Sequence, residues 1–176
     1  MKLHIGCGNN YLDGWVNLDI DTSLKCDIYE DATRLQSIKD SSCDVIYACH
    51  ILEHLSRHEY LSVLEVWYKK LKPHGSLRIS VPDFGKVVEK YTVTQELNEL
   101  LGFLVGGQKD EYDLHKMVFD EKKLTTDLMQ VGFIKVEKWD WRKVDHGKYD
   151  DYSQAYLPHM DKNNGKLMSL NLEASK

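Results

Sequence analysis

Two glycines and two carboxylates near the N-terminus are the first residues whose types and spacing point to chemistry. Gly6-Cys7-Gly8 follows the apolar run 3–5, and glycines there let backbone N–H groups approach a ligand closely. Asp19 and Asp21 end the next apolar run, where a carboxylate can accept both hydroxyls of a ribose. A dinucleotide fingerprint would need a third glycine in place of Tyr11. A tight turn and a solvated strand end are the alternative interpretations.

A second motif, His50-Ile51-Leu52-Glu53-His54, has the H-x-x-E-H spacing of inverzincin zinc peptidases. On a helix its two histidines would share a face, and His58 would extend that row. Catalytic zinc also needs a third protein ligand and a general base beside an open position. The motif directly follows the strand-like run 43–49, which would split the row. We therefore expect no metal site and a packing or capping role for His54, with a zinc hydrolase as an alternative.

The composition excludes several classes of protein. The chain has 176 residues, 42% of them hydrophobic, which suits one globular domain spanning 1–176. No apolar run approaches the roughly 18 residues of a membrane span. The 23 basic and 28 acidic residues give a net charge of −5 without a basic stripe, so we expect no nucleic-acid partner. The short apolar stretch at the N-terminus is not a signal peptide, which predicts a cytoplasmic protein. The four cysteines lack metal-type pairing and are expected to be free thiols.

Strand and helix patterns alternate along the chain. Strands are expected at 3–6, 15–20, 26–32, 43–49, 76–82, 133–141 and 166–174. Helices are expected at 59–71, over most of 85–105, and from the N-cap Asp120 to Gly132, with 72–75 ending the first of them. This alternation predicts an α/β fold, Rossmann-like and doubly wound, with a mostly parallel sheet.

The first crossover of this sheet is unusually short. Only six residues separate Gly8 from Trp15, whereas a parallel crossover with its helix normally needs about ten to twelve. We therefore expect the first crossover helix to be shortened or absent, leaving the nearby ligand site more open.

At this point most of the chain resembles the class I S-adenosylmethionine-dependent methyltransferases, in particular small methyltransferase-11-like members. LHIGCG resembles the first motif of the family, NLDI the acidic second-strand motif, and Glu30-Asp31-Ala32 the segment that contacts adenine. CDVIYACHILEHL and LKPHGSLRISVPD resemble the fourth strand, the following helix and the fifth strand. The resemblance implies a seven-stranded sheet with an antiparallel last strand, S-adenosylmethionine as cofactor and S-adenosylhomocysteine as product.

The resemblance also implies which residues bind the cofactor. They are Gly6, Cys7, Gly8, Asp19, Ile20, Asp31, Ala32 and His50. One departure concerns the acid that the family usually carries at the start of its first motif. This chain has Leu3-His4-Ile5 there, so the contact of that acid is missing or replaced.

The acceptor side is expected beyond the carboxyl ends of the strands, where ligands of doubly wound sheets bind. An insert at about 85–118 and a long polar loop at about 142–166 converge there, and in family relatives the first of these regions recognises the acceptor. The candidate substrate-binding residues are Asp83, Tyr112, His115, Tyr149 and Tyr152. Because histidine titrates near neutrality, His115 and His50 are the candidate catalytic residues for removing a hydroxyl proton.

The sequence thus predicts a methyltransferase that acts on a small-molecule or sugar-containing acceptor, with no membrane partner. The sugar follows from the LEHL and PDF segments, which resemble those of methyltransferases of surface-glycan pathways. Besides the zinc hydrolase, the alternative is a non-catalytic cofactor-binding module with the methyltransferase fold, which the short first crossover would allow.

Overall fold

A computed structural model describes all 176 residues, and its centre is a seven-stranded sheet. The strand order is β3-β2-β1-β4-β5-β9-β6, and β9 alone runs antiparallel to its neighbours. The strands of this sheet are β1 (Lys2–Ile5), β2 (Val16–Asp19), β3 (Ile28–Tyr29), β4 (Cys43–Cys49), β5 (Leu71–Pro82), β6 (Lys135–Lys138) and β9 (Ser169–Ser175). A separate hairpin pairs β7 (Tyr156–Leu157) with β8 (Lys166–Leu167). The predicted fold class is confirmed.

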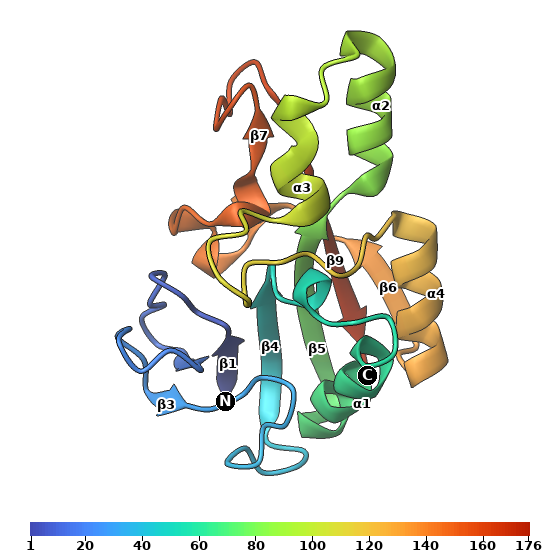
Figure 1. The fold of residues 1–176 in the computed structure, drawn as a ribbon. Coiled ribbons are helices and arrows are strands. Elements are labelled where there is room, and N and C mark those ends of the chain that lie inside the picture. The colour runs from blue at the N-terminus through green and yellow to red at the C-terminus, as the bar shows by residue number, and fades with distance from the viewer.

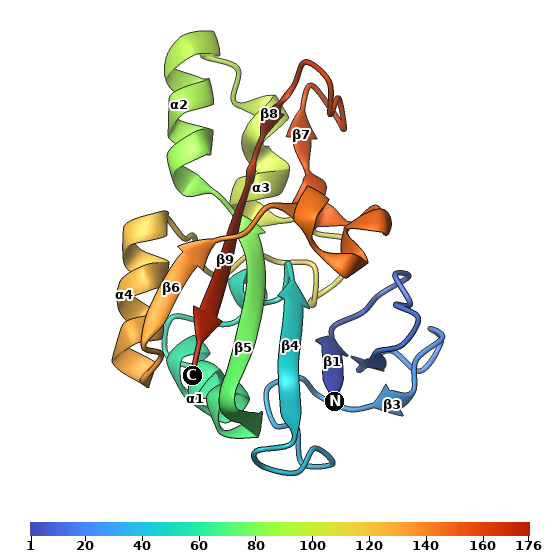
Figure 2. The ribbon, with the colours of Figure 1, turned by 180° about the vertical axis from the view of Figure 1, so that it is seen from behind.

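The α-helices are α1 (Tyr60–Lys70), α2 (Phe84–Thr94), α3 (Leu101–Val105) and α4 (Glu121–Val131). Helices α1 and α4 cover one face of the sheet, while α2, α3 and the β7–β8 hairpin stand beyond the carboxyl ends of the parallel strands (Figures 1 and 2). None of the helices combines the length and apolar character that a membrane crossing would need.

Strand β4 shows why the sheet has two buried faces. Its residues Ile46 and Ala48 join the main core under α1 and α4, whereas Tyr47 belongs to a smaller cluster on the opposite face. Such a run of apolar residues without alternation is typical of a parallel strand that is covered on both sides.

Helix α1 buries Val63, Leu64 and Trp67 against the first of these faces. The Trp67 Nε1 also donates a 2.8 Å hydrogen bond to the carbonyl of Ala32, so the segment after β3 is tied to α1.

The ends of α1 and α4 follow the local sequence signals. Asp120 caps α4 by accepting a 2.7 Å hydrogen bond from the amide of Lys123, and Gly132 ends the helix at φ +120°. Helix α1 stops before Leu71 as expected, but the expected loop 72–75 lies within β5. It forms a bulge, because Leu71 pairs with Cys43 and the next pair, Ser76, is with Val45.

The first crossover helix is absent, which confirms the expectation from the short connection between β1 and β2. The part of the second face around Tyr47 is instead covered by residues 139–157, which contain three 3₁₀ turns and lie toward the carboxyl ends of the parallel strands (Figure 2). The Tyr47 hydroxyl anchors this segment by donating a 2.7 Å hydrogen bond to Asp151, and Tyr149 packs against the cluster of Leu12 and Trp15. A polar loop thus takes the place of helices on this face.

Two segments that the sequence assigns to the acceptor side also pack on each other. Val87 and Leu100 from the insert form a small core with Met168, and Leu157 of β7 packs against it. The insert and the long loop therefore form one structure above the sheet.

Candidate functional site

The turn after β1 carries both glycines of the first motif in the left-handed region, Gly6 at φ +61° and Gly8 at φ +52°. A Cβ on Gly6 would lie 1.9 Å from Cδ1 of Ile51, so a larger residue would displace the Ile51 side chain, and the left-handed φ also favours glycine here. A Cβ on Gly8 would meet no atom within 4 Å. Gly8 therefore leaves open space beside the backbone, which suits close approach of a ligand.

Asp19 at the end of β2 is joined to this turn. Its Oδ2 accepts a 2.8 Å hydrogen bond from the amide of Gly8, and its Oδ1 accepts one of 3.0 Å from the amide of Asp21. The side chain is partly exposed, so lone pairs remain for a ligand. This arrangement of a glycine turn and a carboxylate fits the ribose of a nucleoside cofactor.

Cys7, between the two glycines, is buried, and its amide donates to the carbonyl of Leu18. Burial and the nearby Asp19 raise the pKa of the Cys7 thiol to about 12, so the thiol stays protonated. All four cysteines are free, as expected. Cys7 can thus shape the turn and does not supply a nucleophile.

The segment after β3 has local partners. Asp31 accepts a 2.8 Å hydrogen bond from the amide of Thr33, and its side chain is 40% exposed. Ala32 is half-buried and packs against the main core. These contacts fix the course of the segment that the family resemblance assigns to adenine binding.

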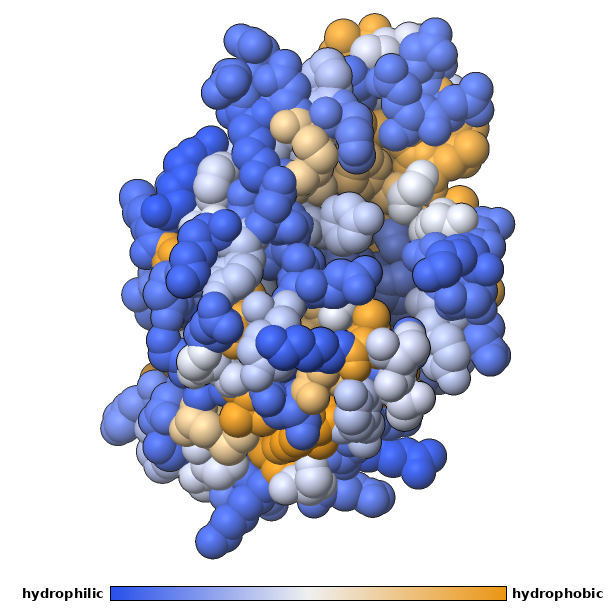
Figure 3. Space-filling view, turned by 90° about the vertical axis from the view of Figure 1, so that its left-hand side faces the viewer, coloured by the Kyte–Doolittle hydropathy of each residue, from blue (hydrophilic) through white to orange (hydrophobic).

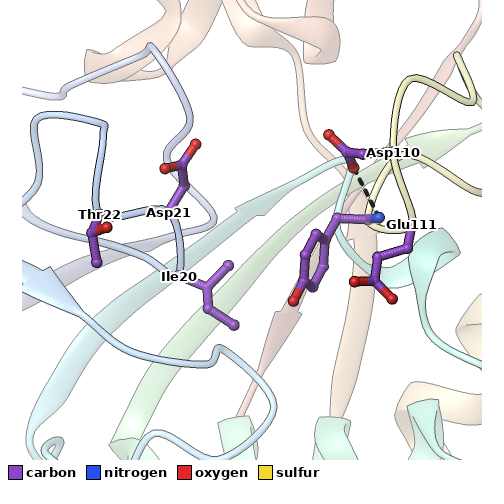
Figure 4. A pocket seen from close by; sticks show the side chains of 6 residues that line it. Ile20, Asp21, Thr22, Asp110 and Glu111 are labelled. Carbon is purple, nitrogen blue, oxygen red and sulfur yellow. Dashed lines mark hydrogen bonds between the residues drawn. The ribbon is translucent and has the colours of Figure 1, made fainter.

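A cleft of about 530 Å³ opens between the end of β2 and the insert. Ile20, Asp21 and Thr22 lie on one side, and Asp110, Glu111 and Tyr112 lie on the other (Figure 4). The face of the molecule that Figure 3 shows is mainly hydrophilic, and it has a hollow between polar side chains. The structure thus brings Ile20 and Tyr112, expected on the cofactor and acceptor sides respectively, to the same cleft.

The end of β4 gathers the histidines of the site. His50 adopts φ +54° directly after the strand, and the chain then forms a 3₁₀ turn at Leu52–His54. The Nδ1 of His50 lies 3.0 Å from Oε1 of Glu53, and a donor atom of Glu53, one of His54 and one of His115 all lie within 4.8 Å of one another. We call Glu53, His54 and His115 the histidine–glutamate cluster.

The insert is docked onto this cluster by its backbone. The amides of Lys116 and Met117 donate hydrogen bonds of 2.7 and 3.1 Å to the carbonyl of Glu53. His115 is therefore held against the end of β4, although 62 positions separate it from Glu53 in the sequence.

Opposing effects act on the pKa values of Glu53 and His115. Burial would raise the pKa of Glu53, but the neighbouring His50 and His54 outweigh it and hold this pKa below its usual value. Burial lowers the pKa of His115, against the opposing effect of Glu53. The cluster is thus built around an ionised carboxylate and a neutral His115 imidazole at neutral pH.

The other predicted acceptor residues lie in different surroundings. Tyr152 is 64% exposed, and its ring centroid lies 5.4 Å from that of His50. Asp83 caps α2 by accepting a hydrogen bond of 3.2 Å from the amide of Lys86. The Tyr149 hydroxyl is engaged with Asp13 at the β1–β2 connection. The structure therefore brings Tyr152 to the end of β4 and gives Asp83 and Tyr149 structural partners.

The H-x-x-E-H segment does not form the expected helical row. It crosses from the end of β4 into a 3₁₀ turn, and His58 is exposed and accepts from Arg57 instead. The strand-like run 43–49 before the motif predicted that the row of histidines would be split. However, the third member of the cluster comes from His115, which the sequence analysis did not connect with Glu53.

Two further features had not been anticipated. Asp110 and Glu111 place acidic groups opposite Asp21, and only the polar composition of this stretch hinted at a surface role. His146 is buried among aromatic rings, 4.1 Å from Tyr47 between centroids. The sequence predicts a long polar loop at 142–166, but no periodicity indicates that it covers a sheet.

Comparison with known proteins agrees with this geometry. A family model described as "Methyltransferase domain" matches residues 3–79, which run from β1 into β5. No curated protein sequence matches the chain.

Solved structures share the fold at low sequence identity. A S-adenosylmethionine-dependent methyltransferase from Archaeoglobus fulgidus is 18% identical, with a TM-score of 0.61 over 99% of this chain and 85% of that chain. A possible histamine N-methyltransferase from Thermotoga maritima is 14% identical, with a TM-score of 0.63 over 99% and 81%. A methyltransferase from Mesorhizobium loti is 14% identical, with a TM-score of 0.59 over 99% and 90%.

The sheet order, the glycine turn joined to Asp19 and the family match together define the class. Residues 3–79 match the methyltransferase-domain family, and the whole chain has the fold of solved S-adenosylmethionine-dependent methyltransferases. The methyltransferase-domain match supports an enzyme that uses S-adenosylmethionine as its cofactor.

Proposed function

We propose that the enzyme methylates a hydroxyl group of a small-molecule or sugar-containing acceptor. The observation that carries this proposal is the exposed ring of Tyr152 beside His50, with the histidine–glutamate cluster next to them. An exposed aromatic ring suits the apolar face of a sugar or another ring, and imidazole lone pairs suit a hydroxyl donor. The alternatives were a zinc hydrolase and a non-catalytic binding module.

The cofactor half of the proposal uses the carboxyl ends of β1 to β4. Gly8 provides open space, and Asp19 has free lone pairs for two ribose hydroxyls. The full set proposed to hold the cofactor is Gly6, Cys7, Gly8, Asp19, Ile20, Asp31, Ala32 and His50. When bound, S-adenosylmethionine supplies a methyl group on a positively charged sulfur.

The acceptor half assigns its chemistry to two histidines. His115 donates its Nδ1–H to the carbonyl of Phe103 at 3.1 Å, so Nε2 carries the lone pair that can accept the hydroxyl proton. His50 is proposed to orient the hydroxyl from the end of β4. Asp83, Tyr112, Tyr149 and Tyr152 complete the proposed acceptor side, within one domain that spans 1–176 and includes the insert 85–118 and the loop 142–166.

The charge of the cleft favours neutral or cationic acceptors. Asp21, Asp110 and Glu111 line it, and carboxylates repel the phosphates of a nucleic acid. A nucleic-acid partner is therefore not part of this proposal, and the cytoplasmic location remains a prediction.

Transfer of a labelled methyl group tests the proposal directly. The purified enzyme is given methyl-labelled S-adenosylmethionine with free sugars, sugar nucleotides and small alcohols, and with an RNA oligonucleotide and a protein as controls. We expect label only on a hydroxyl-bearing small acceptor. Label on RNA or protein, or release of no label to any acceptor by an enzyme that binds the cofactor, would contradict it.

Two substitutions connect the activity with the site. We expect Tyr152→Ala to raise KM for the acceptor about tenfold, because the exposed ring contacts it. We expect His115→Ala to lower kcat by about 100-fold. Neither substitution should alter the Kd of the cofactor by more than a few-fold. Unchanged acceptor kinetics in both variants would remove this end of β4 from the acceptor site.

A further inference from the structure

Glu53 is a buried carboxylate that faces a histidine and no lysine or arginine. Its exposure is 1%, and neither Oε1 nor Oε2 has a hydrogen-bond partner, although Oε1 lies 3.0 Å from Nδ1 of His50. A buried ionised group is strongly unfavourable unless it is paired or coordinates a metal. His50 is thus the one charge partner that the protein offers Glu53, and it pairs only when its imidazole is protonated.

The histidines next to Glu53 are oriented by backbone carbonyls. Nδ1 of His54 lies 3.2 Å from the carbonyl of Leu114, and Nδ1 of His115 lies 3.1 Å from that of Phe103. Because a carbonyl only accepts, each Nδ1 carries the hydrogen, and each Nε2 keeps a lone pair. Imidazoles that ligate metals are held in this way, with the second nitrogen donating to a carbonyl.

The donor and acceptor roles of the two His50 nitrogens also indicate a need for a cation near Glu53. The Ser169 hydroxyl donates a 2.5 Å hydrogen bond to the carbonyl of Tyr152, so its oxygen accepts from Nε2 of His50 at 3.2 Å. In the neutral imidazole the lone pair is then on Nδ1, which faces the carboxylate of Glu53. Two lone pairs that face each other are stabilised by a cation nearby.

We propose that Glu53, His54 and His115 bind a divalent first-row transition-metal ion, of which Zn²⁺ is the representative. Two imidazoles and one carboxylate form the ligand set of catalytic zinc sites that keep one position open. Donor atoms in a tetrahedral zinc site lie about 3.4 Å apart. The cluster, with its donors within 4.8 Å, must contract by roughly an ångström when the ion binds.

This assignment replaces the expectation of no metal. That expectation depended on a missing third ligand and on the splitting of the row of His50, His54 and His58. The row is indeed split, but His115 arrives from the insert and supplies the third ligand. The site is therefore not that of the peptidase motif, because its ligands come from two distant segments.

The ion deepens the proposed function and, for this role, rests on it. A hydroxyl oxygen bound at the open position would lose its proton more readily, and the proton would pass to solvent. The Nε2 of His115 would then bind the ion. The ion, and not this nitrogen, would contact the acceptor hydroxyl. Hard, oxygen-preferring Mg²⁺ suits this nitrogen-rich set poorly.

Calorimetry with zinc chloride on the tag-free, chelator-treated enzyme tests the site without any acceptor. We expect one Zn²⁺ per chain with a Kd of about 1 μM or tighter, and much weaker binding of Mg²⁺. Glu53→Gln and His115→Ala should each weaken Zn²⁺ binding at least 100-fold. His58→Ala is the matched control, because His58 is exposed and outside the cluster, and it should bind Zn²⁺ as the wild type does.

Thermal unfolding and cofactor binding show whether each variant is folded, and His115→Ala keeps the test decisive if Glu53→Gln does not fold. Absence of Zn²⁺ binding at 100 μM, or equal binding by the wild type and folded His115→Ala, would overturn the proposed site. Methyl transfer that persists in chelator without Zn²⁺ binding overturns the site and leaves the proposed function intact. Zn²⁺ binding that is lost in both variants supports the site even if every acceptor fails, which would count against the proposed function only.

Discussion

The amide of Gly8 donates a 2.8 Å hydrogen bond to Oδ2 of Asp19, which joins the turn after β1 to the end of β2. Gly8 leaves the space beside it open, and Asp19 is partly exposed at the same place. The residue proposed to leave room for the cofactor and the residue proposed to bind its ribose are therefore coupled. A change at either one should affect cofactor binding more than it affects the fold.

We predict that Asp19→Ala weakens S-adenosylmethionine binding by about 1 to 3 kcal/mol, or roughly 5- to 150-fold in Kd, because a charge-assisted acceptor for two hydroxyls is lost. Calorimetry with S-adenosylhomocysteine measures the change. Asp21→Ala is the matched control, since Asp21 is exposed and its side chain bonds only to Ser23. A large loss of affinity in Asp21→Ala with none in Asp19→Ala would show that the other acid binds the ribose.

Gly8→Ala should reduce cofactor affinity at least tenfold, because its methyl group would occupy the open space. The left-handed φ of +52° should also lower the free energy of unfolding by about 1 kcal/mol. Gly14→Ala separates the two effects, since Gly14 has φ +80° and open space but lies before the start of β2, whereas Asp19 ends that strand. We expect it to lose similar stability and keep its affinity. Equal affinities for both variants would argue against the assignment of Gly8.

Tyr149→Phe should lower the free energy of unfolding by about 1 kcal/mol. Its hydroxyl accepts from the amide of Asp13 and donates to the Asp13 carboxylate, both at 3.0 Å, so it ties residues 139–157 to the β1–β2 connection. Tyr152→Phe is the control, because the Tyr152 hydroxyl makes no hydrogen bond with the protein and its ring is retained. Chemical denaturation of the two variants measures the difference. Equal stabilities of the two variants would show that the contact between Tyr149 and Asp13 does not stabilise the fold.

His146 should make the stability depend on pH. Burial, and secondarily Arg78 and His4, lower its pKa to about 4, against the opposing effects of Asp151 and Asp145. Because the unfolded state binds the proton from about pH 6.5 and the folded state only near pH 4, stability is complete above pH 6.5. Between these values it should fall by about 3 kcal/mol as the pH decreases.

His146→Phe tests this dependence, since it keeps an aromatic ring between Tyr47 and Trp139 and removes the proton-binding nitrogens. We expect the free energy of unfolding of this variant to change less between pH 6.5 and 4 than that of the wild type. Parallel pH profiles for the two proteins would mean that other groups determine the acid sensitivity.

Local signals in the sequence were sufficient for most of the fold. The apolar run of β4, the cap at Asp120 and the stop at Gly132 all act within a few residues, and the structure has each of them at the expected place. The short link between Gly8 and Trp15 likewise predicted the missing helix. The strand bulge at 72–75 was missed, because its residues have the turn chemistry that usually separates two elements.

The site could be predicted only where neighbouring strands bring it together. Parallel strands end at the same edge of a sheet, so Gly8 and Asp19 could be placed side by side from their strand ends alone. The approach of His115 to Glu53 depends on how the insert folds back, which no local pattern encodes. The covering of the second sheet face by residues 139–157 depends in the same way on contacts between distant segments, such as Tyr47 with Asp151.

A crystal structure of the enzyme with S-adenosylhomocysteine tests the central claim most directly. We predict density for the ligand at the carboxyl ends of β1, β2 and β4, with the ribose hydroxyls on Asp19 and the backbone at Gly8 against the ligand. The sulfur should face His50 and the histidine–glutamate cluster, where the acceptor hydroxyl is proposed to bind. Density at another place on the chain, or no density from crystals grown at millimolar ligand, would contradict the account.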